Sequence, residues 1–287
     1  MSSSKVWFIT GASTGFGLTM TKHVLRNGDI AVATLRTPSN LDVLRAEYPS
    51  SAKLLIIKLD VTKPEEISRA FNEVKEKLGR IDYVFNNAGY AVIGEVEGVK
   101  EADARAMFEV NFWGAMNVSK EALEFFREVN KPQGGYLLNV SSSVGLVAKP
   151  PTGWYTASKH ALEGATETLA KEIDPEWNIR ISLLEFGAFK TGGIRSAVLT
   201  PPHPSYTNPN LPTNIMRRLF KGFTVSGDPE KAIDFVYEYF MTVAKPPLRL
   251  LIGLDVIKDV RGKIESLTKD VDNAEAVTKD KDLTISN

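Results

Sequence analysis

A tyrosine and a lysine four residues apart give this sequence its clearest chemical signal. Tyr155 and Lys159 lie in the run Thr-Gly-Trp-Tyr-Thr-Ala-Ser-Lys, residues 152–159. On a helix, residues four apart share one face, so the phenol and the ammonium would meet in one site. A nearby ammonium favours phenolate and would lower the pKa of the phenol, which suits it to exchange a proton with a reacting oxygen. Taken alone, this spacing is more typical of a solvated helix face.

A glycine-rich run follows the first apolar stretch, which we predict to be a strand over Val6–Thr10. The run reads Thr10-Gly11-Ala12-Ser13-Thr14-Gly15-Phe16-Gly17. Glycine allows a sharp turn and a close backbone approach to a phosphate. The helix predicted over Leu18–Arg26 would offer its N–H groups and positive dipole end to a pyrophosphate, with the hydroxyls of Ser13 and Thr14 as further donors. The position between strand and helix favours this interpretation over a tight turn without a ligand.

The composition excludes several classes of function. The 287 residues carry no net formal charge, so nothing draws the whole chain toward nucleic acid or an anionic membrane. There is no Cys, which excludes disulfides, thiolate nucleophiles and Cys-ligated metals, and the three His lack the spacing of a metal site. The start lacks the apolar region of a secretory signal, and no apolar run approaches the ~18 residues of a membrane span. We therefore expect a soluble cytoplasmic protein without a metal, a nucleic-acid partner or a membrane partner.

Short apolar runs alternate with longer amphipathic stretches, as in parallel strands joined by helices. Further strands are predicted over Ile30–Leu35, Leu54–Leu59, Tyr83–Asn86, Tyr136–Val140, Ile179–Leu184 and Leu248–Ile252. Further helices are predicted over Pro64–Leu78, Ala104–Val129, Tyr155–Ile173 and from Asp228 to about Val243. Near-continuous apolar strands indicate burial on both faces. We expect an α/β fold over residues 1–287: a single-domain, Rossmann-type doubly wound parallel sheet of about seven strands with helices on both faces.

Two segments break this alternation. Gly192–Gly227 is rich in proline and has scattered apolar residues, which predicts a long irregular loop. It leaves the sheet at the carboxyl end of a strand, where α/β folds bind ligands. We expect a substrate lid there, mobile without ligand and closing over cofactor and substrate. The tail from about Asp270 is polar, and we expect it to be loosely held.

Three motifs occur in one order: the glycine-rich run, Asn86-Asn87-Ala88-Gly89 after the fourth strand, and Tyr-x-x-x-Lys at 155–159. In this combination the chain resembles the short-chain dehydrogenases/reductases (SDRs), closely from Val6 to about Thr191 and in outline beyond. The resemblance implies an oxidoreductase that transfers hydride between a nicotinamide cofactor and a small-molecule carbonyl or alcohol. It also allows a homodimer or a homotetramer.

The resemblance implies four catalytic residues. Tyr155 would be the general acid or base, and Lys159 would lower its pKa and hold the nicotinamide ribose. The serine of the family lies thirteen residues before the tyrosine, which selects Ser142. Its neighbours would cap and support the loop: Ser141 and Ser143. The asparagine of the family corresponds to Asn111, which would hold a water in the proton path; an ordinary buried hydrogen-bonding role is the alternative.

By the same resemblance, cofactor contacts come from the glycine-rich run and from the ends of later strands. They are Gly11, Ser13, Thr14, Gly15, Phe16, Gly17, Arg36, Asp60, Val61, Asn87, Ala88, Gly89, Tyr155, Lys159, Gly187, Phe189 and Thr191. Asp60 would bind the adenine amino group or cap the next helix, and Asn87 would also hold strands together. One departure is Phe186, which replaces the usual proline before Gly187 and puts the rigidity of this turn in question.

Cofactor choice depends on the end of the second strand. NAD-selective sites carry Asp or Glu there to bind the ribose 2′-hydroxyl, whereas an Arg accommodates a 2′-phosphate. This chain has Leu35 followed by Arg36. Because guanidinium–phosphate hydrogen bonds are strong, we expect NADP(H). The alternative for Arg36 is a solvent-facing side chain at a strand end.

The predicted substrate walls are mainly apolar. They come from Val92–Val96, Ser143–Trp154 and 192–227, and include Val92, Ile93, Val144, Leu146, Trp154, Ile194, Leu199, Tyr206, Met216, Leu219 and Phe220. This lining favours an apolar or aromatic ketone, aldehyde or secondary alcohol, hence a carbonyl reductase (ketoreductase) or alcohol dehydrogenase. Two alternatives keep the fold. A silent NADP(H)-binding regulatory or scaffold protein would not need Ser142 or the proton relay, and a lyase or epimerase usually needs a longer substrate domain.

Overall fold

The apolar runs of the sequence form a seven-stranded parallel sheet in the order β3-β2-β1-β4-β6-β7-β9. The computed structural model describes residues 4–49, 52–191, 197–222, 226–279 and 281. The strands are β1 Val6–Thr10, β2 Ile30–Leu35, β3 Leu54–Lys58, β4 Tyr83–Asn86, β6 Gly135–Val140, β7 Ile179–Phe186 and β9 Arg249–Ile252. The order reverses beside β1, which makes this edge of the sheet the place where α/β folds bind ligands. The predicted doubly wound fold is confirmed, and no strand end differs from the prediction by more than two residues.

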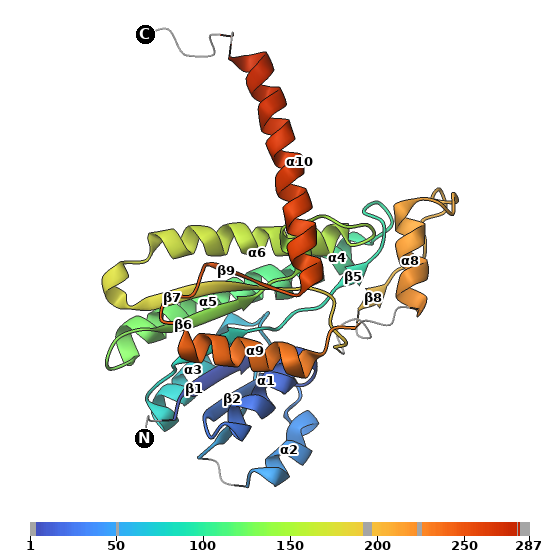
Figure 1. Cartoon of the computed structure of the whole chain (residues 1–287). Helices are drawn as coiled ribbons and strands as arrows, with labels where there is room; N and C mark the ends of the chain where they lie inside the picture. Colours follow the sequence, from blue (N-terminus) through green and yellow to red (C-terminus); the bar gives the residue numbers. More distant parts are fainter. Residues whose placement is uncertain (1–3, 50–51, 192–196, 223–225, 280, 282–287) are drawn as a thin grey trace.

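Helices cover both faces of the sheet and enclose two apolar cores (Figure 1). On one face pack α1 Gly15–Arg26, α2 Asp42–Glu47 and α9 Pro229–Thr242; on the other pack α3 Pro64–Leu78, α5 Ala115–Glu124 and α6 Gly153–Glu172. Helix α3 begins with Pro64 and ends at Gly79, whose φ of 67° is the left-handed conformation that favours glycine. The predicted helices over 64–78, 155–173 and 228–243 are therefore present with small shifts at their ends.

The helix predicted over Ala104–Val129 is interrupted by wider turns. It consists of α4 Glu101–Phe108, the π-helical η2 Glu109–Gly114, α5, and the π-helical η3 Phe125–Val129. A π turn adds a residue to the helical repeat and is frequent at functional sites. Here η2 contains Asn111, so the wider turn determines where this buried amide lies.

Much of the segment predicted as an irregular loop is regular. After β7, Val198–Leu199 form β8, which pairs in parallel with β5, Val92–Ile93. Residues Pro212–Gly222 form α8. The prediction of irregular structure is therefore wrong for 198–199 and 212–222. These elements are too short to leave a clear periodic pattern in the sequence, and β8 forms only because β5 supplies its hydrogen bonds.

A buried ion pair attaches α8 to the end of β5. The Arg217 guanidinium donates to both carboxylate oxygens of Glu95, at 2.7 and 2.6 Å, and to the carbonyl of Thr200 at 2.8 Å. The Glu95 side chain is 2% exposed and that of Arg217 8% exposed. The hydrogen bonds of Arg217 hold the pKa of Glu95 well below its usual range, at about 2, although burial opposes them. Whether 192–227 closes on a ligand stays a prediction.

The C-terminal region is helical where a loose tail was expected. Helix α10 runs from Leu254 to Thr278 and projects away from the sheet (Figure 1). Its side chains from Arg261 onward are exposed. In the part of the chain that the structure describes, no helix is long and apolar enough to cross a membrane.

We predict that Arg217→Ala destabilises the protein by about 3–5 kcal/mol, because it leaves the Glu95 carboxylate buried without its cation. Urea denaturation measures the loss, and amide hydrogen exchange should become faster across 197–222. Arg218→Ala is the matched control, since the exposed Arg218 donates only to the carbonyl of Pro209 among the hydrogen bonds of the described residues. Similar losses in the two variants would contradict a specific role for the ion pair.

Candidate active site

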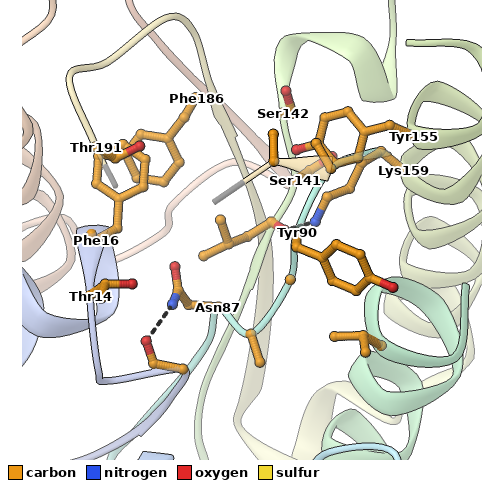
Figure 2. Close-up of a pocket in the computed structure, with 18 of the residues that line it drawn as sticks. Thr14, Phe16, Asn87, Tyr90, Ser141, Ser142, Tyr155, Lys159, Phe186 and Thr191 are labelled. Carbon is orange, nitrogen blue, oxygen red and sulfur yellow. Dashed lines mark hydrogen bonds between the residues drawn. The ribbon is translucent and has the colours of Figure 1, made fainter. Parts of the chain in front are cut away.

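The predicted catalytic and cofactor residues converge on one cavity of about 900 Å³ at the carboxyl ends of the parallel strands. Figure 2 shows Ser142, Tyr155 and Lys159 together on one side and Thr14 and Phe16 on the other. Every predicted site residue lines this cavity except two. Those two are Gly17 and Asn111, which lie directly behind the lining.

Tyr155 is held in its protonated form by its surroundings. Burial raises the pKa of the Tyr155 phenol, and a hydrogen bond with Ser142 opposes this rise. We expected Lys159 to lower the pKa of this phenol, whereas in this structure burial is the largest cause and raises it. A protonated phenol beside a serine hydroxyl forms a pair of donors that can bind one oxygen atom.

Lys159 lies one turn after Tyr155 on α6, as the spacing predicted. Its side chain is buried, and its ammonium donates to the carbonyl of Val140 at 2.9 Å. Burial lowers the pKa of Lys159 to about 8, while the charge of Glu163 raises it. The ammonium is thus charged at neutral pH and tied to the last residue of β6, next to Ser141.

The Asn111 amide is satisfied by protein groups. Its Oδ1 accepts from the Tyr90 N–H at 3.0 Å, and its Nδ2 donates to the Tyr90 carbonyl at 2.9 Å and to Ser158 Oγ at 3.1 Å. Its side chain therefore fixes the backbone after the Asn-Asn-Ala-Gly motif. A Cβ at Gly89 would lie 3.0 Å from Asn111 Oδ1 and 3.7 Å from Lys159 Nζ, so glycine leaves room between these two groups.

The serine triplet is organised differently from the expectation. Ser142 itself caps the short helix η4, Ser143–Gly145, because its Oγ accepts from the Val144 N–H at 3.4 Å. The expectation that Ser141 and Ser143 supply the cap is therefore wrong. One side chain both starts η4 and faces the cavity, so the cap orients the predicted catalytic hydroxyl.

Buried amides join the strand ends beneath the cavity. Asn86 Nδ2 donates to Asn139 Oδ1 at 2.9 Å and to the Ala115 carbonyl at 2.8 Å, and Asn139 Nδ2 donates to Thr166 Oγ1 at 3.0 Å. These bonds connect β4 and β6 with α5 and α6. Because each donor and acceptor is buried, breaking one bond leaves its partner unsatisfied, which makes the arrangement rigid.

Asn87 has the strand-joining role that the sequence suggested. Its N–H donates to Thr10 Oγ1 at 2.8 Å, and its Nδ2 donates to the Thr10 carbonyl at 2.9 Å. The Ala88 N–H donates to the same hydroxyl at 2.9 Å. The end of β4 is thereby fixed to the end of β1, where the glycine-rich run begins.

The glycine-rich run has the shape that a dinucleotide phosphate needs. Gly11 has φ +67°, and a Cβ there would lie 3.0 Å from Ala88 Cα. A Cβ at Gly17 would lie 2.3 Å from the Gly11 carbonyl oxygen, so Gly17 permits the turn by packing behind it rather than by lining the cavity. Thr14 precedes α1 with extended backbone and makes no side-chain cap. The first-turn N–H groups of α1 can therefore bind a phosphate.

Asp60 and Arg36 both line the cavity, just beyond the ends of β3 and β2. Burial raises the pKa of Asp60, but the hydrogen bonds from the Thr62 N–H and hydroxyl, at 3.0 and 2.8 Å, and the charge of Arg36 bring it below its ordinary value. Asp60 lines the cavity and shapes the turn before α3, but it does not cap this helix, whose N-cap is Lys63 without a side-chain cap. The expected capping role is therefore wrong, and the contact with adenine stays a prediction. The exposed Arg36 follows β2 and also lines the cavity.

Phe186 compensates for the missing proline through packing. Its ring stacks on Phe16 with centroids 4.0 Å apart and meets the edge of Phe189 at 5.9 Å. The side chain is 3% exposed, and the following Gly187 N–H donates to Ile252 in β9. Three aromatic rings from two segments therefore pack together at the turn, and we expect this packing to restrict it where the proline is missing.

The predicted substrate wall is only partly confirmed. Ile93, Val144 and Phe220 line the cavity. The other described members do not line it: Val92, Leu146, Trp154, Leu199, Tyr206, Met216 and Leu219. Ile194 lies outside the described residues. Trp154 points elsewhere because its Nε1 donates to the carbonyl of Val96 at 2.9 Å, and Leu199 and Leu219 are exposed.

Sequence reasoning missed several lining residues and a charge cluster. The missed lining residues are Leu59, Thr62, Tyr90, Ala91, Ala106, Glu109, Val110, Thr152 and Ala197. Tyr90 follows the Asn-Asn-Ala-Gly motif directly, which is the signal that could have identified it. The cluster is not visible in the sequence, because Glu163, Glu185 and Arg249 come from α6, β7 and β9.

This charge cluster lies one helical turn beyond Lys159. Arg249 Nε lies 3.2 Å from Glu163 Oε2 and 3.4 Å from Glu185 Oε1, and its terminal nitrogen lies 2.7 Å from Glu167 Oε2. The Glu185 side chain is fully buried. Burial, and then the charge of Glu163, raise the pKa of Glu185 to about 8, while Arg249 opposes them. The Glu185 carboxyl therefore holds a proton at neutral pH.

Comparison with known proteins agrees with this geometry. A family model described as short chain dehydrogenase matches residues 5–200. "Oxidoreductase calM" of Penicillium decumbens is 34% identical over 95% of this chain and 91% of its own length. The crystal structure of a short-chain dehydrogenase from Streptomyces avermitilis superposes with a TM-score of 0.87, at 32% identity, over 98% of this chain and 100% of that one. An alcohol dehydrogenase from the archaeon Thermococcus sibiricus, complexed with 5-hydroxy-NADP, superposes with a TM-score of 0.70 at 25% identity, over 87% and 96%.

We predict that Glu185→Gln flattens the dependence of stability on pH. In the folded protein Glu185 keeps its proton up to about pH 8, whereas the unfolded chain loses it near pH 4.5. The folded state binds more protons in this window, so the free energy of unfolding should fall as pH rises from about 4.5 to 8. For one proton the slope is at most ~1.4 kcal/mol per pH unit.

Urea denaturation between pH 5 and pH 8 tests this prediction. The slope should shrink in Glu185→Gln and persist in Glu172→Gln, a control at an exposed position at the end of helix α6. A slope that is equal in the wild type and Glu185→Gln would show that Glu185 does not carry the extra proton.

Proposed function

Because the chain belongs to the short-chain dehydrogenase family of oxidoreductases, we propose that it is an NADP(H)-dependent enzyme that interconverts an apolar or aromatic ketone or aldehyde and its alcohol. One observation carries the proposal. The Ser142 hydroxyl and the Tyr155 phenol are hydrogen-bonded on a wall of the dinucleotide-shaped cavity, with the Lys159 ammonium beside them. Two hydroxyl donors and a cation at one place suit a carbonyl oxygen that gains negative charge.

The residues of this chain have distinct tasks in that reaction. Ser142 and Tyr155 donate hydrogen bonds to the carbonyl oxygen, and Tyr155 then transfers its proton to that oxygen. NADPH, when bound, supplies the hydride that reaches the carbonyl carbon. Lys159 places a positive charge beside the phenolate left on Tyr155, which stabilises it until a proton returns. Asn111 positions Tyr90 and the helix turn around Lys159.

The protonated state of Tyr155 suits carbonyl reduction. At neutral pH its phenol is protonated, which is the form that reduction requires. Oxidation of the alcohol would need the phenolate, which the buried site disfavours until Lys159 and Ser142 compensate. The protonated Tyr155 phenol and the proposed binding of NADPH by Arg36 therefore both support reduction as the direction of the reaction.

NADP(H) is the cofactor that the charges support. At the end of β2 the cavity is lined by Leu35 and Arg36, so no carboxylate there opposes a 2′-phosphate. Asp60 lies at the end of the neighbouring β3, where the Thr62 hydrogen bonds occupy its Oδ1. The complex of the archaeal alcohol dehydrogenase with 5-hydroxy-NADP supports the same choice by similarity.

The apolar side of the cavity supports an apolar or aromatic substrate. Its lining includes Ile93, Val144 and Phe220, and the rings of Phe186 and Phe189 on the side of Phe16. Aliphatic and aromatic walls bind apolar ligands by removing their surface from water. To test this substrate class, a panel of aromatic and aliphatic ketones is assayed, and the loss of NADPH absorbance at 340 nm measures turnover of each. Consumption of NADPH also separates an oxidoreductase from a silent binding protein and from a lyase or epimerase.

We predict that Tyr155→Phe binds NADPH nearly as the wild type does but loses turnover by at least ~10²-fold, because the proton donor is removed. Fluorescence titration measures NADPH binding, and ketone-dependent loss of absorbance measures turnover. Tyr90→Phe is the matched control, since it removes a phenol from the same cavity. Turnover of Tyr155→Phe within about tenfold of the wild type would refute the assignment of the proton donor.

We predict that Arg36→Ala weakens NADPH binding by about 1.5–3 kcal/mol while NADH binding changes little, because only NADPH carries the phosphate that Arg36 would bind. Dissociation constants from fluorescence titration give both values. Arg45→Ala, which removes an exposed cation of the following helix α2, should leave both constants unchanged. Equal weakening of NADPH and NADH, or a wild type that prefers NADH, would overturn the role of Arg36.

A further inference from the structure

Helix α10 carries a heptad repeat of apolar residues. With positions labelled a to g, position a holds Ile257, Ile264, Val271 and Thr278, and position d holds Val260, Leu267 and Ala274. The spacing alternates between three and four residues along the whole helix. Such a repeat puts its apolar side chains along one stripe, which is the pattern by which two helices pack knobs into holes.

The structure leaves most of this stripe open. Ile264 is 58% exposed, Leu267 47% and Val271 65%. The first turns of α10 are attached to the rest of the chain, since Val256 is buried and Lys149 forms an ion pair with Asp259. Beyond these turns the helix projects away from the sheet (Figure 1). A projecting helix of this kind gains little from its own hydrogen bonds in water, so its stability depends on packing of the apolar stripe.

The opposite face of α10 is suited to water. Its b, c and f positions are mostly polar, and Lys269 forms an ion pair with Glu265 on this face at 2.9 Å. The contrast between the two faces indicates that the apolar stripe binds a specific partner rather than associating nonspecifically with other apolar surfaces.

We propose that the partner is α10 of a second copy of this chain, in antiparallel orientation. An antiparallel pair places each a residue against a d residue, so Ile264 meets Leu267 of the second copy and Val260 meets its Val271. The axis of symmetry then passes between residues 265 and 266, near the middle of α10. Six apolar contact layers form between residues 257 and 274, over a length of about 27 Å at 1.5 Å per residue.

The flanking charges select this orientation. In an antiparallel pair, position g faces g and position e faces e. Lys263 and Asp270 are g residues and face each other across the pair, and symmetry doubles this attraction. The e residue Arg261 faces the uncharged Thr268 of the second copy, so no like charges meet. In a parallel pair, position g faces the next e, which would bring Asp270 against Glu275 of the other copy. Like charges would meet there, so the parallel arrangement is opposed.

The assembly of the full-length protein tests the proposal. Sedimentation velocity should show association that depends on concentration, and Leu267→Lys should weaken it by at least ~100-fold, because a charge enters the apolar stripe. Ser266→Lys, on the outer face, should change it less than threefold. Retained ketone reduction and thermal stability show that the variants fold, since Leu267 is exposed outside the pair. Association that is absent, or equal in the wild type and Leu267→Lys, overturns the proposal.

A charge exchange tests the predicted contacts directly. Lys263→Asp should weaken association by about tenfold, because it faces Asp270 of the second copy with a like charge. The double variant Lys263→Asp/Asp270→Lys restores opposite charges and should return association to within about threefold of the wild type. Failure of the double variant to recover refutes the pairing of these two positions.

Disulfide trapping distinguishes the orientations, because the chain has no Cys of its own. In the antiparallel pair, Val271→Cys lies about 16 Å along the axis from its own counterpart, so this variant alone should not cross-link under mild oxidation. A mixture of Val260→Cys and Val271→Cys should form a heterodimeric disulfide. A cross-link in Val271→Cys alone, without one in the mixture, would show a parallel pair and overturn the proposal.

Discussion

Buried side-chain amides at the carboxyl ends of the central strands are the constraint on which the site depends. Asn86 and Asn139 join β4 to β6 and to the helices that pack on them, and Asn87 joins β4 to Thr10 at the end of β1. These groups are costly to bury unless every partner is present. Because these hydrogen bonds must all be present, the glycine-rich run, Ser142 and helix α6 keep fixed positions relative to one another.

Burial also sets the charge states of the reacting groups. It keeps the Tyr155 phenol protonated and lowers the pKa of Lys159 to about 8, which leaves the lysine charged at neutral pH. Glu163 counteracts the effect on Lys159, and it is itself balanced by Arg249. The electrostatics of the cavity thus extend beyond its lining to a cluster that would not be recognised from motifs.

The sequence predicted those parts of the structure that follow from local pattern. Continuous apolar runs located every strand of the main sheet, and the spacing of Tyr155 and Lys159 located one wall of the cavity. Two-residue strands such as β5 and β8 have no periodic signal, because each depends on the other for its hydrogen bonds. The contact between Arg249 and Glu163 joins residues 86 apart, so only the fold brings it about.

Helix α10 was not predicted from the sequence for a different reason from that for β5 and β8. Its many charged residues suggested a loose tail from about Asp270, and the average composition concealed an ordered pattern of apolar positions. Phe186 is a further case, since the loss of a proline suggested a flexible turn. The contacts of Phe186 with Phe16 and Phe189 give this turn packing that a motif cannot show, because Phe16 lies far away in the chain.

The buried ion pair of Glu95 and Arg217 means that two distant regions of the chain must change together as the sequence evolves. The two residues lie 122 positions apart, on the loop after β5 and on α8. Because either charge alone would be costly to bury, neither can be replaced without the other. New pocket shapes can arise through cavity-lining residues of α8 such as Phe220 while the pair is inherited unchanged. A chimera that takes residues 197–222 from a relative must therefore take the matching loop after β5 as well.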